Sequence, residues 1–144
     1  MSVVVWDGMT LATDKSASNG NIHHCLDKAW VYKDALLTGT GSLGGILAMR
    51  GWYKAGAKAE DFPEMQKGNN WCHFIVVTEH GLERYEQSPI PIEHGRNACA
   101  FGSGQDIAYG ALAMGANAEQ AVGIANQYVA DCGHGVDVFT LTGE

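Results

Sequence analysis

The pattern of apolar and polar residues predicts short strands that are interrupted by separate groups of helices. The first apolar run, Val3–Trp6, is continuous, as in a strand that is covered on both faces. Asp7-Gly8 follows this run, and Met9–Thr13 returns with strand-forming residues. Because glycine readily adopts the positive φ of a tight turn, the pattern predicts a hairpin with Asp7-Gly8 as its two-residue loop. In that register Ser2 would pair with Thr13.

A second hairpin and a helix are predicted before the middle of the chain. Lys28–Tyr32 and Ala35–Thr38 are strand-like and flank a turn at Lys33-Asp34. The small polar residues of Ser16–Asn21 predict a surface loop between the two hairpins. From Ser42 to Ala55, apolar side chains recur at a spacing of three to four residues, which predicts an α-helix.

The second half of the chain predicts a strand meander, a pair of helices and a terminal strand. The expected elements are, in order, at most a short helix at Asp61–Lys67, strands at Trp71–Thr78, Leu82–Glu86, Pro89–Glu93 and Ala98–Phe101, a helix at Gln105–Met114, and a strand at Val136–Leu141. Asn117 and Gln120 have the spacing of a capping box at the start of the second helix of the pair. Because strands come in hairpins and helices are grouped apart, this order favours an α+β fold.

Length and composition restrict the class of protein. A chain of 144 residues, 46% of them hydrophobic, can bury its own core, so we expect a single domain over residues 1–144. The net charge of −7 and the pI of about 5.2 argue against nucleic acid or a membrane surface as a partner. No apolar run reaches the roughly 20 residues that span a bilayer. The four cysteines stand singly, which is typical of a reduced, cytoplasmic protein.

Two short motifs suggest ligands and are weak on their own. His23-His24-Cys25 places potential metal ligands side by side, but adjacent residues of a strand point to opposite faces, so we expect no metal. Gly39-x-Gly41-x-x-Gly44 matches the dinucleotide-binding fingerprint. Dinucleotide binding through this motif also needs a parallel strand soon after the helix, ending in an acidic residue. Glu60-Asp61 does not end such a strand. We therefore expect no cofactor and keep a dinucleotide binder as a minor alternative.

Several other motifs are unspecific when taken singly, but their order and spacing along the chain are typical of one protein family. These motifs are Ser2 followed by a short strand and Trp6-Asp7-Gly8, Asp14 at the end of the first hairpin, Lys28 at the start of the second, Leu37–Gly41 around Gly39, Phe101–Gly104 before the helix pair, and Asp131–Asp137 before the last strand. In this order the chain resembles the proteasome β-subunit and HslV peptidases, which are N-terminal-nucleophile hydrolases. It is most similar to the compact HslV-like proteins.

The resemblance implies a fold and an activity. The fold would be a four-layer αββα sandwich, with two antiparallel sheets between helical layers, formed by one proteasome/HslV-like domain. The activity would be that of an N-terminal-nucleophile amidohydrolase, a threonine-peptidase-like endopeptidase that acts on peptides or unfolded proteins without a cofactor. Such proteins form self-compartmentalising homo-oligomeric rings in the cytoplasm, and an ATP-dependent unfoldase is a candidate partner.

The resemblance also implies the roles of the site residues. Removal of Met1, which a small residue at position 2 permits, would leave Ser2 with a hydroxyl nucleophile and an α-amine base. That amine has an unperturbed pKa of about 7.7–8.0, and the ammonium of Lys28 would lower it. Asp14 would hold Lys28 charged and in place. The remaining roles are an oxyanion donor, the N–H of Gly39, and two groups that orient the amine, Ser103 and Asp131.

The chain departs from the family pattern in ways that bear on activity. Serine replaces the N-terminal threonine, and one long helix of the central pair is reduced to Asp61–Lys67. The predicted register places Ser2 opposite Thr13, whereas the chemistry needs the nucleophile near Asp14, which a three-residue turn or a bulge would achieve. Two further interpretations stay open. One is an inactive structural or adaptor ring subunit of the same fold, and the other is a small-molecule amidase.

Overall fold

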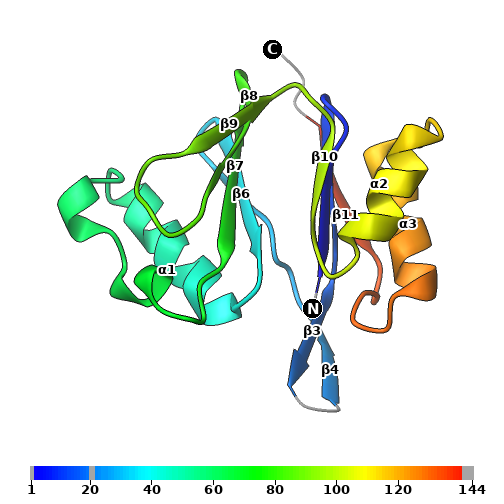
Figure 1. Ribbon diagram of the computed structural model, residues 1–144, viewed down its shortest axis with the longest axis horizontal. Helices are drawn as coiled ribbons and strands as arrows, with labels where there is room; N and C mark the ends of the chain where they lie inside the picture. Colours follow the sequence, from blue (N-terminus) through cyan, green and yellow to red (C-terminus); the bar gives the residue numbers. More distant parts are fainter. Residues whose placement is uncertain (1, 20–21, 141–144) are drawn as a thin grey trace.

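Two antiparallel sheets lie face to face between two helical layers (Figure 1). The computed structural model describes residues 2–19 and 22–140. Met1, the last residues of the predicted Ser16–Asn21 loop and the end of the predicted Val136–Leu141 strand lie outside this part of the chain. The layers run helix, sheet, sheet, helix, so the predicted αββα sandwich of the α+β class is confirmed.

The first sheet carries the chain start at its centre. Its strand order is β10 (Cys99–Gly102), β1 (Val3–Trp6), β2 (Thr10–Asp14) and β11 (Val136–Thr140). Helices α2 (Gln105–Ala113) and α3 (Ala118–Tyr128) cover its outer face (Figure 1). Small side chains dominate the contact, with Ala121 and Ala125 of α3 packed near Val3 and Val5. The capping box of Asn117 and Gln120 forms as predicted.

The second sheet has the order β5 (Trp30–Tyr32), β6 (Ala35–Thr40), β7 (His73–Thr78), β8 (Gly81–Tyr85) and β9 (Ile92–Gly95). Helix α1 (Leu43–Lys54) covers its outer face, where Met49 and Trp52 pack against Leu37 and Phe74. Ser42 caps α1 by accepting a hydrogen bond from the N–H of Gly45. The predicted short helix consists of two 3₁₀ turns, η1 (Ala59–Asp61) and η2 (Glu64–Lys67).

The faces that the two sheets turn toward each other form the central core. Val4 and Trp6 of the first sheet pack in one cluster with Ile75, Val77 and Leu82 of the second. Val3 and Val5 point the other way, into the cluster beneath α3. Every residue of β1 is therefore buried, as its continuous apolar run predicts.

The register of the first hairpin differs from the sequence-based prediction. Val4, rather than Ser2, pairs with Thr13, and the two-residue loop is Gly8-Met9, not Asp7-Gly8. The cause is the side chain of Asp7, whose Oδ1 accepts hydrogen bonds from the N–H groups of Met9 and Thr10 at 3.0 and 2.8 Å. Such an aspartate turn holds Asp7 at the strand end and leaves the positive φ of 97° to Gly8.

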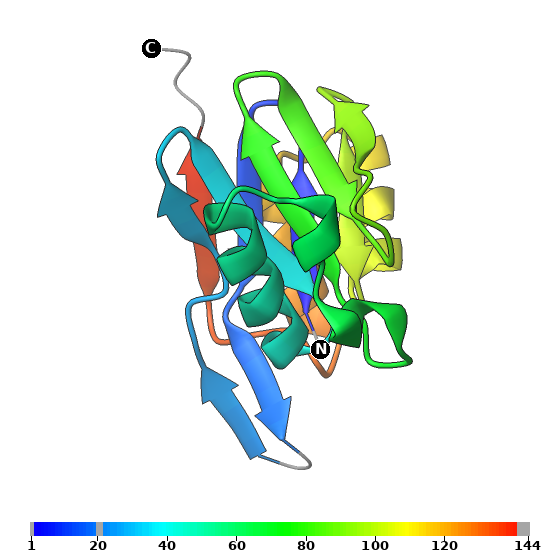
Figure 2. The same ribbon diagram turned by 90° about the vertical axis from the view of Figure 1, so that its left-hand side faces the viewer.

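The predicted surface loop at Ser16–Asn21 is wrong. The chain instead forms a two-stranded sheet of β3 (Ser16–Asn19) and β4 (Ile22–Cys25), which projects beyond the four layers (Figure 2). Small polar residues disfavour a strand only by their local preference, and backbone pairing between the two segments overrides it here. Where this sheet joins the body, the Leu26 N–H donates to the carbonyl of Lys15 at 2.8 Å.

Candidate functional site

Ser2 lies at the open end of the sandwich, between the two sheets. It is buried, and its backbone nitrogen donates a hydrogen bond to Oγ of Ser103 at 3.2 Å. The Ser103 hydroxyl in turn donates to the Ser2 carbonyl at 3.2 Å, so the two residues are joined twice. Gly102 has a positive φ of 100°, and a Cβ there would collide with the Ser2 carbonyl. The turn before α2 is therefore shaped around Ser2.

Asp14 and Lys28 form a buried ion pair next to the chain start. Lys28 Nζ lies 2.6 Å from Asp14 Oδ1 and also donates to the Ser16 carbonyl at 2.5 Å. The side chain of Asp14 is fully buried, and that of Lys28 is 6% exposed. Buried charges persist where they are paired and hydrogen-bonded, and these two are both. The pair is thus a built feature of the site.

The corrected hairpin register brings Asp14 to the chain start. Val3 donates its N–H to Asp14 Oδ1 at 3.1 Å, so the carboxylate lies one residue from Ser2. Oδ2 of Asp14 accepts from the N–H groups of Ser16 and Gly133, each at 3.3 Å. The structure thus brings Ser2, Asp14, Lys28 and Ser103 together, and no bulge is needed in β1 or β2 to do so.

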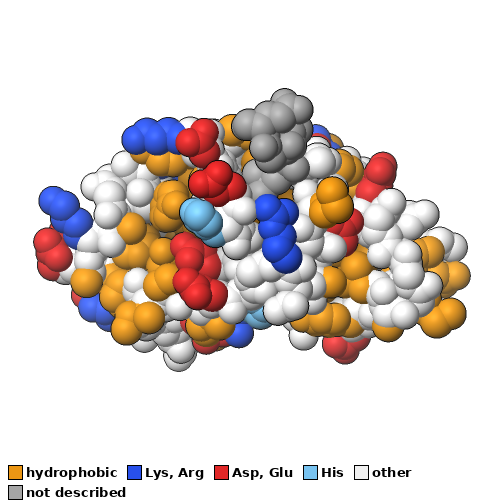
Figure 3. Space-filling view, turned by 90° about the horizontal axis from the view of Figure 1, so that it is seen from above, with side chains coloured by type: hydrophobic (Ala, Val, Ile, Leu, Met, Phe, Trp, Pro, Cys, Tyr) orange, Lys and Arg blue, Asp and Glu red, His pale blue; other side chains and the backbone are white. Residues whose placement is uncertain are grey.

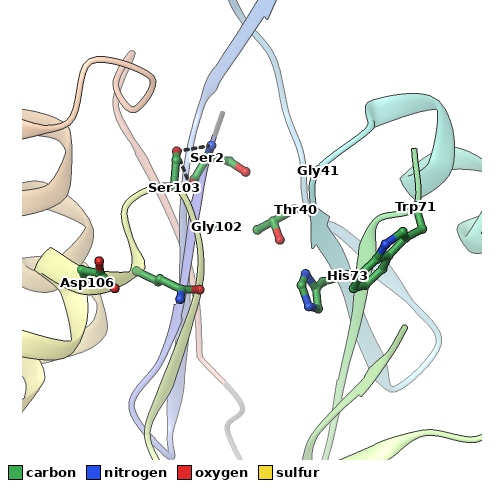
Figure 4. A pocket seen from close by; sticks show the side chains of 9 residues that line it. Ser2, Thr40, Gly41, Trp71, His73, Gly102, Ser103 and Asp106 are labelled. Atoms are coloured by element: carbon green, nitrogen blue, oxygen red, sulfur yellow. Dashed lines mark hydrogen bonds between the residues drawn. The ribbon is translucent and has the colours of Figure 1, made fainter. Parts of the chain in front are cut away.

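Two pockets meet at Ser2. The larger pocket, of about 430 Å³, is lined by Ser103, Thr40, Trp71, His73 and Asp106 among others (Figure 4). The smaller pocket, of about 190 Å³, is lined by side chains that include Lys28, Ala17, Leu43 and Ile46. Ser2 and Gly41 line both pockets. An extended ligand could therefore cross the Ser2 hydroxyl with one part in each pocket.

Gly39 and Gly41 occupy different places relative to Ser2. Gly39 lies inside β6, paired with Phe74, and lines neither pocket. A Cβ at Gly39 would lie 2.5 Å from the His73 carbonyl, so its small size serves strand packing. Gly41 follows the strand with a positive φ of 105° and lines both pockets. Gly41, rather than the predicted Gly39, is thus the glycine that borders the pockets next to Ser2.

Comparison with solved structures identifies the fold. The chain superimposes on the Thiobacillus denitrificans BPH structure with a TM-score of 0.72, at 17% identity, over 100% of both chains. For the same protein in complex with epoxomicin the TM-score is 0.73, at 16% identity, over 96% of this chain and 97% of that one. For eukaryotic HslV from Trypanosoma brucei the values are 0.67 and 18%, with the same shares covered. The chain has an HslV-like fold.

This result confirms the fold that the order of the motifs predicts. No protein-family model matches the sequence, and no curated protein matches it significantly. At 16–18% identity the comparison shows the similarity of the backbone fold. The chemistry has to be inferred from the side chains around Ser2.

The segment before β11 reaches the surroundings of Ser2 through Cys132 and Gly133, which follow the predicted Asp131. Asp131 is exposed in the turn after α3, and its neighbour Cys132 is buried. Cys132 Sγ lies 4.0 Å from Ser103 Oγ, and Gly133 donates to Asp14. Burial and the nearby Asp14 carboxylate raise the pKa of the Cys132 thiol, so it stays protonated at neutral pH. A lone cysteine beside a glycine carries no signal that could have predicted this contact.

Aromatic residues form the far wall of the larger pocket. The rings of Trp71 and His73 lie 4.8 Å apart, and His73 Nε2 is 3.4 Å from a carboxylate oxygen of Glu86. Burial and the positive charge of Arg84 lower the pKa of His73, and Glu86 opposes this only in part. His73 is therefore neutral at pH 7. Trp71 and His73 stand at the start of a predicted strand, and the sequence analysis gives neither of them a role in the site.

The ligand motifs of the sequence have structural explanations. Gly41 belongs to the turn before α1 and Gly44 to the first turn of that helix, and β6 and β7 on either side of the helix pair antiparallel. The parallel strand that a dinucleotide site needs is thus replaced by an antiparallel one. Within residues 2–19 and 22–140, no cluster of three metal-binding side chains forms. Among the helices of that same part of the chain, none is long and apolar enough to cross a membrane.

Proposed function

We propose that this protein is an N-terminal-nucleophile endopeptidase that uses Ser2 after removal of Met1. The observation that supports it most is the position of Ser2, whose nitrogen is held by Ser103 where the two pockets meet. Lys28, which is buried and paired with Asp14, lines the smaller pocket. A hydroxyl, a nitrogen that becomes an amine, and a fixed ammonium are the parts that this chemistry needs.

The proposed reaction begins with the Ser2 hydroxyl. Its Oγ attacks the carbonyl carbon of a peptide bond while the α-amine takes the hydroxyl proton. The carbonyl oxygen becomes an oxyanion, which accepts a hydrogen bond from the N–H of Gly41. The C–N bond then breaks, and the ammonium gives its proton to the leaving nitrogen. Water hydrolyses the resulting ester by the same steps and restores Ser2.

The remaining residues set the pKa and the orientation of the Ser2 α-amine, which is the base. The Lys28 ammonium lowers the pKa of the α-amine by like-charge repulsion, which keeps the amine able to accept a proton near pH 7. Asp14 holds Lys28 in place through the 2.6 Å contact. Ser103 orients the amine through its hydroxyl. Asp131 stays a prediction of the resemblance, and Cys132 supports Ser103 from the same segment.

We also propose that the subunits assemble into a homo-oligomeric ring in the cytoplasm. Helices α2 and α3, with the C-cap residue of α2, expose large apolar side chains on the outer layer, including Met114 at 90% and Tyr128 at 69% exposure. Figure 3, which views the molecule of Figure 1 from above, shows hydrophobic side chains over both helical flanks. Such surfaces are typical of interfaces. Peptides or unfolded proteins would be the substrates, and an ATP-dependent unfoldase is the candidate partner.

The deciding experiment compares chains that differ only at the start. Protein released from an N-terminal fusion so that Ser2 comes first should hydrolyse small peptide amides. A chain with alanine inserted before Ser2 keeps the hydroxyl, moves the amine and should be inactive. Ser2→Ala is the blank. Epoxomicin, which is present in a structure of the Thiobacillus denitrificans protein, should raise the melting temperature of the Ser2-first protein alone.

The outcomes separate the alternatives. An inactive Ser2-first protein that still forms a ring supports the structural-subunit interpretation and contradicts the peptidase. Turnover of small amides by a monomer, without cleavage of longer peptides, supports the amidase. The mass of protein from its native host shows whether Met1 is removed, and a population that retains Met1 throughout contradicts the proposed mechanism.

A further inference from the structure

The two pockets at Ser2 differ in the functional groups that they contain. Ser103, which holds the Ser2 nitrogen, lines the larger pocket and not the smaller one. Lys28 lines the smaller pocket and not the larger one. Figure 4 shows Ser103 and the Ser2 nitrogen together on one side of the larger pocket, opposite His73 and Trp71. The two sides of the site are therefore chemically different, with Ser103 on one side of Ser2 and Lys28 on the other.

Proton transfer determines which part of a substrate occupies which pocket. When the C–N bond of the tetrahedral intermediate breaks, the leaving nitrogen must take a proton from the Ser2 ammonium. Proton transfer needs hydrogen-bond distance, so the leaving nitrogen lies on the side of the Ser2 amine. That side is the Ser103 side, which belongs to the larger pocket. The residue after the cleaved bond thus enters the larger pocket, and the residue before it enters the smaller one.

The larger pocket is suited to a long cation. Asp106, in the first turn of α2, is the one carboxylate among the described residues that line it, and Trp71 offers an indole ring from the opposite wall (Figure 4). His73 is neutral, and the nearby Arg84 is paired with Glu86. A guanidinium is planar, stacks on aromatic faces and pairs with carboxylates. An aspartate or glutamate side chain would instead be repelled by the negative charge of Asp106.

The smaller pocket has the opposite character. Its side chains from Ala17, Leu43 and Ile46 are apolar or small, and its volume of about 190 Å³ is less than half that of its neighbour, about 430 Å³. None of the described residues that line it is a carboxylate, and the Asp14 carboxylate is already paired with Lys28, so a basic side chain finds no acidic partner there. A short aliphatic residue fits this pocket, and arginine does not.

We infer that the site selects peptides with a basic residue, arginine above all, directly after the cleaved bond, and that Trp71 and Asp106 make this selection. The inference rests on the proposed peptidase function and adds the identity and orientation of its substrate. Trp71 and Asp106 determine specificity, while the chemistry stays with Ser2.

The test uses quenched fluorescent peptides of the form Ala-Ala-Val-X-Ala-Ala, with X as Arg, Phe, Ala or Glu. The Ser2-first protein should cleave the Val–X bond fastest for Arg and slowest for Glu. Asp106→Asn should lower kcat/KM for Arg by about two- to fivefold and leave Phe unchanged, because an exposed ion pair contributes modestly. Trp71→Ala should lower kcat/KM for both the Arg and the Phe peptide, and the loss should be smaller in Trp71→Phe, which keeps an aromatic ring. Asp61→Asn and Trp30→Ala, which line neither pocket, are the matched controls.

A binding series keeps this inference separate from the proposed activity. Peptides that begin with Arg, Ala or Glu mimic the released product, and their affinity is measured with Ser2-first and Ser2→Ala proteins. Arg should bind most tightly and lose its advantage in Asp106→Asn. If binding follows this order while every peptide remains uncleaved, the peptidase proposal fails and the pocket assignment stands. Equal affinities for Arg and Glu overturn the inference. So does a specificity change in Asp106→Asn at the residue before the cleaved bond.

Discussion

At the scale of single residues, Lys28 differs from every other lysine in being buried and paired with Asp14. Lys28→Ala should slow peptide-amide hydrolysis by about 10²–10⁴-fold, since the amine loses the charge that adjusts it. Lys33, exposed in the next turn, should be nearly neutral when changed to alanine. Lys28→Arg should not restore the rate, because a guanidinium is bulkier and distributes its charge differently.

The same substitution has a cost in stability that must be measured alongside the rate. Lys28→Ala leaves Asp14 buried without its cation, which lowers the free energy of unfolding by about 3–5 kcal/mol. The double variant Lys28→Ala/Asp14→Asn removes both charges and should recover stability without recovering activity. Rates are compared below the thermal transition of each protein. Equal activity of Lys28→Ala and the parent would show that another group adjusts the amine.

At the scale of elements, Asp7 joins the first hairpin to α3. Its Oδ1 closes the Gly8-Met9 turn, and its Oδ2 accepts a hydrogen bond from the N–H of Ala118 at 2.9 Å. Asp7→Ala should lower the free energy of unfolding by about 1–2 kcal/mol, as the loss of a helix cap does. Urea unfolding measures the change, and Asp34→Ala in the exposed turn of the second hairpin is the control. A change no larger than the control would mean that backbone pairing alone holds the register.

At the scale of the whole molecule, the exposed faces of α2 and α3 predict self-association. Light scattering at micromolar concentration should show one discrete oligomer of several subunits. Met114→Glu, which places a charge at a side chain that is 90% exposed, should shift the population toward smaller species and leave the circular dichroism spectrum unchanged. Met9→Glu, at the far tip of the first hairpin, is the matched control. A monomeric parent at that concentration would contradict the ring.

Much of this protein could be predicted from local sequence. The buried strand Val3–Trp6, the helix capped by Ser42 and the capping box at Asn117 all depend on residues within one or two turns of each other. Lys28 and Asp14 were assigned from the order of short motifs, and the structure does bring them together. Interactions of this kind can be inferred from sequence because their partners are near in the chain or recur in a known order.

Only the tertiary structure decided which residues meet at Ser2. Its hydrogen bond to Ser103 spans 101 positions, and Gly133 reaches Asp14 across 119. The hairpin register depends on an Asp7 side chain that also bonds α3, and local pattern alone favoured a different loop. The choice of Gly41 over Gly39 depends on β7, which fixes Gly39 inside the sheet. The Asp7 turn is set by contacts with the neighbouring Met9 and Thr10. In the other cases the deciding contact comes from a distant segment, which the neighbouring sequence does not indicate.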